Sequence, residues 1–135
     1  MYMTNTMVEQ DLFNYLKENL YPDLVMSLSP ISRWDCYSKK RQHRIELKCR
    51  KNHYEELVIE KGKFDAMIRK ANENFDVPIY INSTPKGIYS WILFYVYPDW
   101  SYKDLPKTTD FNDNNMIPKE IAMLPICDAE ILFVN

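Results

Sequence analysis

The sequence predicts an α/β fold in which a mixed central β-sheet is flanked by α-helices. Three observations lead to this prediction: an amphipathic helix pattern near the N-terminus, three short strand patterns after it, and a second helix pattern followed by two more strands. Elements in this order are typical of layered α/β domains. With 135 residues, 46% of them hydrophobic and 27% charged, residues 1–135 are expected to form a single domain.

The first helix is predicted over residues 7–20, where four apolar side chains fall on one stripe. Two strands are predicted next, over residues 24–29 and 33–38, and the basic segment "KKRQ" forms the turn after the second strand. This turn leads directly into the most informative segment of the chain.

Residues 43–50 alternate between apolar and charged side chains, which predicts a third strand with two different faces. The apolar face carries Ile45, Leu47 and Cys49. The charged face carries Arg44, Glu46, Lys48 and Arg50. Such a row is either a solvated strand face with cross-strand ion pairs or a site that uses the charges.

A short extended segment at residues 57–59 precedes the second helix, and two further strands are predicted over residues 77–82 and 88–97. The apolar face of this helix consists of Phe64, Met67, Ile68 and Ala71. Residues 98–135 form an extension, which is expected to be loop-rich up to residue 118. Its tail is expected to add one or two short edge strands or a helical turn.

Composition excludes several classes of function. The chain contains two glycines, too few for a phosphate-cradling loop of the P-loop or dinucleotide-binding type. The longest apolar run, residues 91–97, is too short to span a bilayer, and no secretory signal precedes the first helix. The three cysteines lack zinc-ligand spacing and are predicted to be buried thiols in a reducing compartment, which favours a cytoplasmic protein with no membrane partner.

Charge is distributed unevenly along the chain, although the net charge is only −2. Residues 39–53 contain seven Lys or Arg and one acid, whereas residues 99–135 contain three Lys and seven acids. An isoelectric point near 5.7 excludes a bulk polycation, but a local basic ridge remains compatible with contact to phosphate groups.

Three carboxylates and one lysine are expected to meet beside the predicted sheet. Glu46 and Lys48 are two residues apart on one strand and therefore project from the same face. Asp35 lies on the preceding strand and can approach Glu46 across the sheet. Glu9 falls on the inward stripe of the first helix, although a carboxylate near a helix N-terminus is equally explained by the helix dipole.

Such a cluster requires a compensating charge. Two carboxylates about 4 Å apart repel each other by roughly 4 kcal/mol at an effective dielectric near 20, and bound Mg²⁺ or Mn²⁺ reverses that repulsion. The metal would activate water and neutralise charge on an attacked phosphate. Lys48 would position or deprotonate the water, or stabilise the transition state. The side chains expected to contact the phosphate backbone are Lys39, Lys40, Arg41, Arg44 and Arg50.

The segment "WDCY", which contains Asp35, and the segment "IELKCR", which contains Glu46 and Lys48, together resemble the PD-(D/E)xK nuclease superfamily. The resemblance covers residues 7–97 and implies a restriction-endonuclease-like αβββαβ core. One departure is that Trp34 stands where the motif has its proline.

The resemblance also implies roles for individual residues. Asp35 and Glu46 would be metal ligands, the backbone carbonyl of Leu47 would be a third, and Lys48 would be the catalytic lysine. Glu9 matches the acidic first helix of many members. It would be an accessory metal ligand, or it would contact the metal ligands without binding the metal itself. Lys61 and Lys63 lie in the helix that follows the motif strand; both suit the helix surface, and Lys63 is the better candidate for a phosphate contact.

The function expected from these residues is metal-dependent hydrolysis of phosphodiester bonds in DNA. A chain of 135 residues has little room for base-reading elements, so structure-selective or partner-targeted cleavage is expected. Cleavage of two strands would suit a homodimer, for which residues 88–97 are the first candidate surface. Two alternatives remain open at this stage. One is a non-catalytic nucleic-acid-binding or assembly module on the same fold, and the other is a structural protein whose charged strand is only surface.

Overall fold

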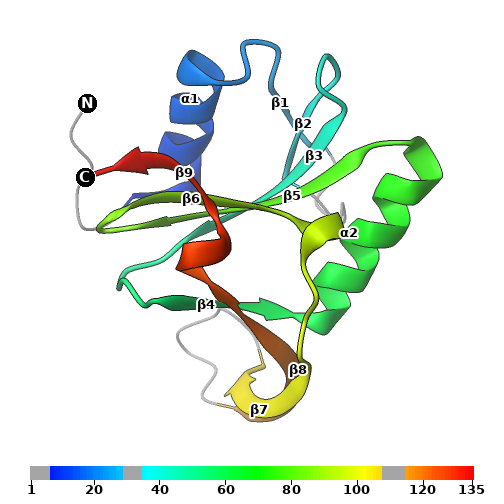
Figure 1. Ribbon diagram of the computed structural model, residues 1–135, viewed down its shortest axis with the longest axis vertical. Helices are drawn as coiled ribbons and strands as arrows, with labels where there is room; N and C mark the ends of the chain where they lie inside the picture. The colour runs from blue at the N-terminus through cyan, green and yellow to red at the C-terminus, as the bar shows by residue number, and fades with distance from the viewer. Residues whose placement is uncertain (1–6, 29–34, 108–114) are drawn as a thin grey trace.

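The computed structural model describes residues 7–28, 35–107 and 115–135. Within these residues, two α-helices, nine strands and two short 3-10 helices are arranged as a six-stranded and a three-stranded sheet (Figure 1). The elements are α1 (Glu9–Asn19), β1 (Val25–Met26), β2 (Cys36–Ser38), β3 (His43–Cys49), β4 (Glu56–Glu60), α2 (Lys61–Asn74), β5 (Val77–Thr84), β6 (Gly87–Ile92), η1 (Leu93–Tyr95), β7 (Ser101–Pro106), β8 (Met116–Pro125), η2 (Ile126–Asp128) and β9 (Glu130–Val134).

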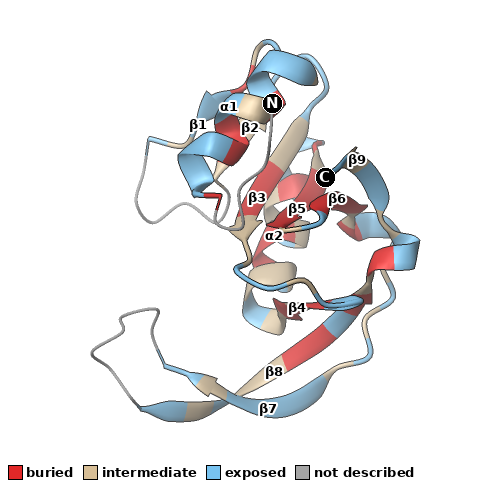
Figure 2. Cartoon of the chain, turned by 90° about the vertical axis from the view of Figure 1, so that its left-hand side faces the viewer, coloured by how far each residue is buried: buried red, intermediate tan, exposed pale blue. Residues whose placement is uncertain are grey.

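The larger sheet has the strand order β1-β2-β3-β5-β6-β9, and the smaller has the order β4-β8-β7. β3 and β5 are parallel and every other neighbouring pair is antiparallel, so the predicted mixed sheet is confirmed. Helix α1 covers one face of this sheet, while α2 and the smaller sheet lie on the other face (Figures 1 and 2).

Two hydrophobic cores separate these layers. The first joins the apolar stripe of α1 to the apolar face of β3, where Ile45 and Leu47 are buried as predicted. The second joins α2 to the opposite face of the sheet and to β4 and β8, with Tyr80 and Trp91 at its centre. The charged face of β3 is therefore turned toward α2 rather than toward water. Glu46 is only 4% exposed, so the interpretation of a solvated strand face is wrong for this residue.

Both helices and the first five predicted strand positions are found, but the predicted strand over residues 88–97 is too long. β6 ends at Ile92, and the chain turns through η1, which inserts the side chain of Leu93 into the second core. In a continuous apolar run, no alternation of apolar and polar residues shows where the strand ends. β6 is paired on both edges and almost fully buried, so the predicted self-association surface over residues 88–97 is exposed mainly after Ile92, at Tyr95 and Tyr97, and self-association there stays a prediction.

The C-terminal part of the chain contains more sheet than predicted. Residues 101–106, expected in a loop, form β7, and β8 is the ten-residue middle strand of the smaller sheet. β9 is an edge strand, as one of the expected alternatives, and it extends the larger sheet beside β6. Nearly every residue of β7 is exposed, so no alternation of apolar and polar side chains marks it as a strand.

The cysteines are all free thiols. Cys36 is buried and Cys49 half-buried, but the prediction of a buried thiol is wrong for Cys127, which lies in the exposed 3-10 turn η2. No helix in the three described segments is long and apolar enough to cross a membrane.

Replacement of Gly87 by alanine is expected to destabilise the protein by about 1–3 kcal/mol. A Cβ atom at this position would lie 2.3 Å from the backbone oxygen of Phe133 in β9, so the two strands would have to separate. Thermal unfolding measures the effect. The matched control is Gly62→Ala in α2, where nothing lies within 4 Å and where no loss of stability is expected. Equal melting temperatures for the two variants would contradict the position of β9.

Candidate active site

The site is built where one edge of β3 becomes open. β2 pairs only with the first three residues of β3, whereas β5 pairs with the whole strand on the other edge. A cavity of about 530 Å³ lies beside the open edge. Its walls come from the start of α1, from the residue before β2, and from β3 with the loop that follows. They consist of Met7, Val8, Glu9, Asp35, Glu46, Leu47, Lys48, Cys49, Arg50 and Lys51.

Asp35 is held in this cavity by β3. Asp35 directly precedes β2, one residue beyond the last strand pair, Cys36 with Ile45, and its side chain lines the same cavity as Glu46. Its backbone N–H donates to the carbonyl of Ile45 at 2.8 Å, and its Oδ2 accepts a hydrogen bond from the N–H of Leu47 at 2.7 Å. Asp35 is therefore fixed to β3 twice, once by its backbone N–H and once by its carboxylate.

Glu46 is buried directly beside this fixed carboxylate. Burial, followed by the negative charge of Asp35, raises the pKa of Glu46 from 4.5 to about 7. Lys63, on α2, approaches Glu46 with Nζ 3.3 Å from Oε2 and opposes this shift, as Lys48 does more weakly. The raised pKa indicates a buried carboxyl group beside a second acid, with too little positive charge to offset both effects.

Glu9 lies in the first turn of α1 and forms another wall of the cavity. Its pKa is raised by burial and then by the charge of Asp35, while Lys48 and Lys63 lower it. These mutual effects place Glu9 within electrostatic range of both the acids and the lysines. The predicted convergence of three carboxylates and one lysine on a single cavity is therefore found in the structure.

Lys48 is half-buried and lines the cavity from the same face of β3 as Glu46. The N–H of Leu47 points to the β2 edge, where it binds Asp35, and in a β-strand the carbonyl of a residue points to the same edge as its N–H. The Leu47 carbonyl thus lies on the cavity side of β3, next to the two acids.

The oxygen donors of this cavity fit a hard divalent cation bound by two carboxylates. Asp35 and Glu46 line the same cavity, and a divalent ion would offset the burial and the charge of Asp35 that together raise the pKa of Glu46. Within residues 7–28, 35–107 and 115–135, no three His, Cys, Asp or Glu side chains are grouped closely enough to hold a metal together. Mg²⁺ commonly retains several waters, so two carboxylates and a carbonyl form a sufficient set.

The basic residues predicted to contact phosphate fall into different environments. Arg44 forms an ion pair with buried Asp76 at 2.5 Å and stacks over Tyr37, so it fastens β3 to the end of α2. Its guanidinium side chain is only 12% exposed. The prediction of a phosphate contact is therefore not supported for Arg44 by its surroundings.

Lys39, Lys40 and Arg41 are exposed in the turn before β3. At about 3.3 Å per residue, the start of β3 lies about 17 Å from Lys48, so this turn can contact only nucleic acid that extends well beyond the cavity. Lys51, a cavity-lining residue just after β3, was missed by the sequence reasoning because it lies outside the strand alternation. Lys63 was the better candidate for a phosphate contact on the second helix, and that role stays a prediction. In the structure Lys63 forms an ion pair with Glu46, which depends on how α2 packs.

No family model matches the chain, and no curated protein matches its sequence. Among solved structures, the fold is similar to that of Hjc, a Holliday junction resolvase from the archaeal hyperthermophile Archaeoglobus fulgidus and a member of the PD-(D/E)xK nuclease superfamily. The TM-score is 0.59 at 12% sequence identity, and the match covers 92% of this chain and 88% of that chain. The restriction-endonuclease-like fold predicted from the motif is therefore confirmed.

Proposed function

We propose that this protein is a metal-dependent nuclease of the PD-(D/E)xK type that hydrolyses phosphodiester bonds in DNA. The observation that carries the proposal is the arrangement of Asp35, Glu46 and Lys48 on the walls of one cavity, where burial and the charge of Asp35 raise the pKa of Glu46. Neither a fold nor a charged strand requires two acids to lie together beside a lysine. This arrangement lowers stability, so a function is the better explanation for it.

Asp35, Glu46 and the Leu47 carbonyl would hold Mg²⁺ or Mn²⁺, and Glu9 would bind a water on the side of α1. When bound, the ion would supply an activated water and would neutralise charge on the attacked phosphate. The protein contributes rigidity: the hydrogen bond from Leu47 N–H fixes Asp35, and the ion pair with Lys63 fixes Glu46. Ligands held in this way need little reorganisation when the substrate arrives.

Lys48 would act on the attacking water or on the developing negative charge of the phosphate. Its ammonium group can donate a hydrogen bond to the water and orient it toward phosphorus. It can also stabilise the additional charge that accumulates on the phosphate oxygens as the bond to water forms. Either role requires a position beside the two acids, which the spacing of Glu46 and Lys48 on one strand provides.

Arg50 would hold a phosphate of the DNA strand that is cut. Its Nε donates to Asn82 at 2.8 Å, and its Nη2 donates to the Val58 carbonyl at 2.8 Å and to the Tyr80 hydroxyl at 2.9 Å. Nη1 has no hydrogen-bond partner within the described part of the chain, and Arg50 lines the cavity. A guanidinium fixed on one side and open on the other is pre-organised for an anion.

Branched DNA is the proposed substrate. The similar structure is named as a Holliday junction resolvase, and this chain covers most of its length. The exposed basic turn at residues 39–41 lies far enough from the cavity to contact a second arm of a junction. Since two strands must be cut, we propose that two copies of the chain act together, in the cytoplasm.

Cleavage of a panel of nucleic acids tests the proposed function. Four-way junctions, flaps, nicked duplex, linear duplex and duplex RNA of matched sequence are incubated with the protein and Mg²⁺ or Mn²⁺. We expect metal-dependent cuts near the branch point of DNA junctions and slower cleavage of linear duplex and of RNA. Tight binding of junctions without cleavage under any metal would instead favour the non-catalytic binding module.

A further inference from the structure

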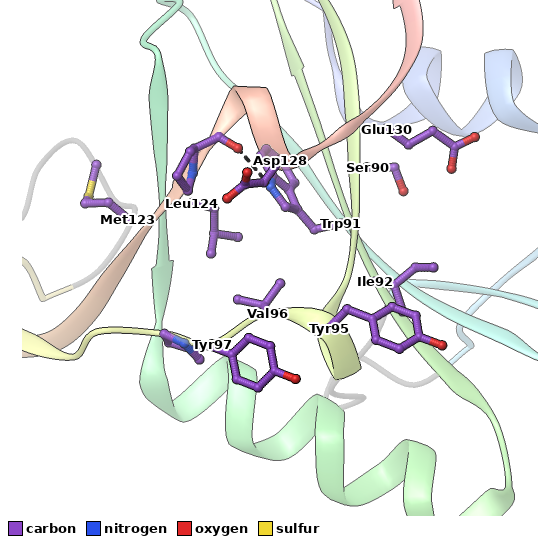
Figure 3. Close-up of a pocket in the computed structure, with 12 residues that line it drawn as sticks. Ser90, Trp91, Ile92, Tyr95, Val96, Tyr97, Met123, Leu124, Asp128 and Glu130 are labelled. Atoms are coloured by element: carbon purple, nitrogen blue, oxygen red, sulfur yellow. Dashed lines mark hydrogen bonds between the residues drawn. The ribbon is translucent and has the colours of Figure 1, made fainter.

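A second cavity, of about 370 Å³, lies away from the active site, between β6, the residues that follow it and the end of β8 (Figure 3). None of its lining residues lines the first cavity. In the larger sheet, β6 is separated from β3 by β5, so the two cavities are formed on different strands. Much of this second cavity is built by residues 95–98 and 123–130, a part of the chain largely outside the motif-bearing region.

The walls of this cavity expose an unusual amount of apolar side chain. Trp91 and Leu124 are buried at its floor, whereas Tyr95, Tyr97 and Met123 are 75%, 91% and 41% exposed. Figure 3 shows the Tyr95 and Tyr97 rings among the side chains that line the pocket. The Trp91 indole N–H donates a hydrogen bond to the Pro125 carbonyl at 3.3 Å. Contiguous exposed aromatic and Met side chains around a hollow are typical of an interaction site.

The charge of the cavity is negative. Asp128 and Glu130 line it, and no Lys, Arg or His does. Neither carboxylate forms an ion pair within the described residues. Hydroxyl groups of Ser90 and the two tyrosines add further hydrogen-bond acceptors. The surface therefore favours a ligand that is cationic and partly apolar, and it disfavours phosphate groups.

We propose that this cavity, the Trp91 pocket, docks a segment of a partner protein in which an arginine or lysine stands beside an apolar side chain. The cation would lie between the tyrosine rings and the Asp128 carboxylate, where ring quadrupole and carboxylate charge both attract it. Glu130, which pairs with Ser90 and faces the α1 side of the sheet, adds attraction from a greater distance. The apolar neighbour would contact Leu124 and Met123. Such docking leaves the active site free, so a partner could bring the protein to DNA through this pocket. The proposal does not depend on catalysis.

Two model peptides test it, acetyl-Leu-Arg-Leu-amide and acetyl-Leu-Gln-Leu-amide, titrated into the full ¹⁵N-labelled chain and followed by NMR. The Trp91 indole N–H gives an individual signal inside the pocket. We expect the arginine peptide to shift this signal and the amide signals of Tyr95, Val96 and Leu124 saturably, with millimolar affinity. We expect the glutamine peptide to bind at least about fivefold more weakly, the loss of one exposed ionic contact.

The matched variant is Asp128→Asn combined with Glu130→Gln, which keeps the shape of the pocket and removes its charge. It should bind both peptides equally weakly, and its DNA cleavage should equal that of the wild type. Equal shifts from both peptides in the wild type, shifts located outside the pocket, or no saturable shift up to 10 mM would overturn the proposal. Shifts of the same signals that depend on protein concentration alone would assign the pocket to a second copy of the chain and would also overturn it.

Discussion

Lys48→Ala is expected to lower the rate of metal-dependent DNA cleavage by about 10²- to 10⁴-fold, the range lost when a proton-transfer or charge-stabilising group is removed. The Lys48 side chain is half-buried at the cavity wall, and its ammonium group forms no hydrogen bond or ion pair with the described residues. Its removal should therefore leave the melting temperature nearly unchanged. Single-turnover cleavage of a junction and thermal unfolding measure the two effects.

The matched control for this experiment is Lys86→Ala, which removes an exposed lysine from the turn between β5 and β6. It should cleave at the wild-type rate. Junction binding by both variants, measured in Ca²⁺, should stay within a few-fold of the wild type. A Lys48→Ala protein that cuts as fast as the control would remove Lys48 from the chemistry. A Lys48→Ala protein that neither cuts nor folds would show instead that the position is structural.

Glu46→Gln is expected to abolish cleavage and, without metal at pH 8, to raise stability. The pKa of Glu46 is raised from 4.5 to about 7 by burial and by Asp35, so the folded state binds this proton more tightly than the unfolded state does. The wild type therefore loses stability as the pH rises from about 4.5 to about 7 and does not recover it above. At 1.36 kcal/mol per pKa unit, the loss is at most about 3 kcal/mol.

The glutamine variant carries no such titrating group, so its stability should vary less over this pH range and should exceed that of the wild type at pH 8. Added Mg²⁺ should reverse the order, because an ion that binds only the folded wild type stabilises it by mass action. Melting temperatures of both proteins at pH 5 and pH 8, with and without Mg²⁺, give the comparison. A wild type that does not respond to Mg²⁺ would favour a structural role for the charged strand.

The geometry of the active site follows from local sequence rules to a large extent. The period of two in β3 places Glu46 and Lys48 together, and a short turn after β2 brings Asp35 to the same cavity as Glu46. Because each of these relations depends on one strand or on two strands joined by a turn, the sequence alone is sufficient to predict them. The helix patterns of α1 and α2 are equally local.

What could not be predicted depends on packing between distant parts of the chain. Arg44 forms an ion pair with Asp76, and Arg50 donates hydrogen bonds to Asn82 and to the Val58 carbonyl. These partners are eight to 32 residues away in the sequence and reach β3 only when α2, β4 and β5 assemble. The alternation of residues along β3 does not show whether water or a helix covers the charged face. β7 was missed for the related reason that its pairing, and not its burial, defines it. β8 lies where a short edge strand was one expected alternative, but it is a ten-residue middle strand because β4 and β7 pair with its two edges.

The most direct test of the active site is a crystal structure of the protein soaked in Mn²⁺ at pH 8, with the metal located by anomalous scattering. The proposed function predicts a peak about 2–2.3 Å from a carboxylate oxygen of Asp35 and from one of Glu46, with the Leu47 carbonyl beside it. No peak between these two side chains at saturating Mn²⁺ would contradict it.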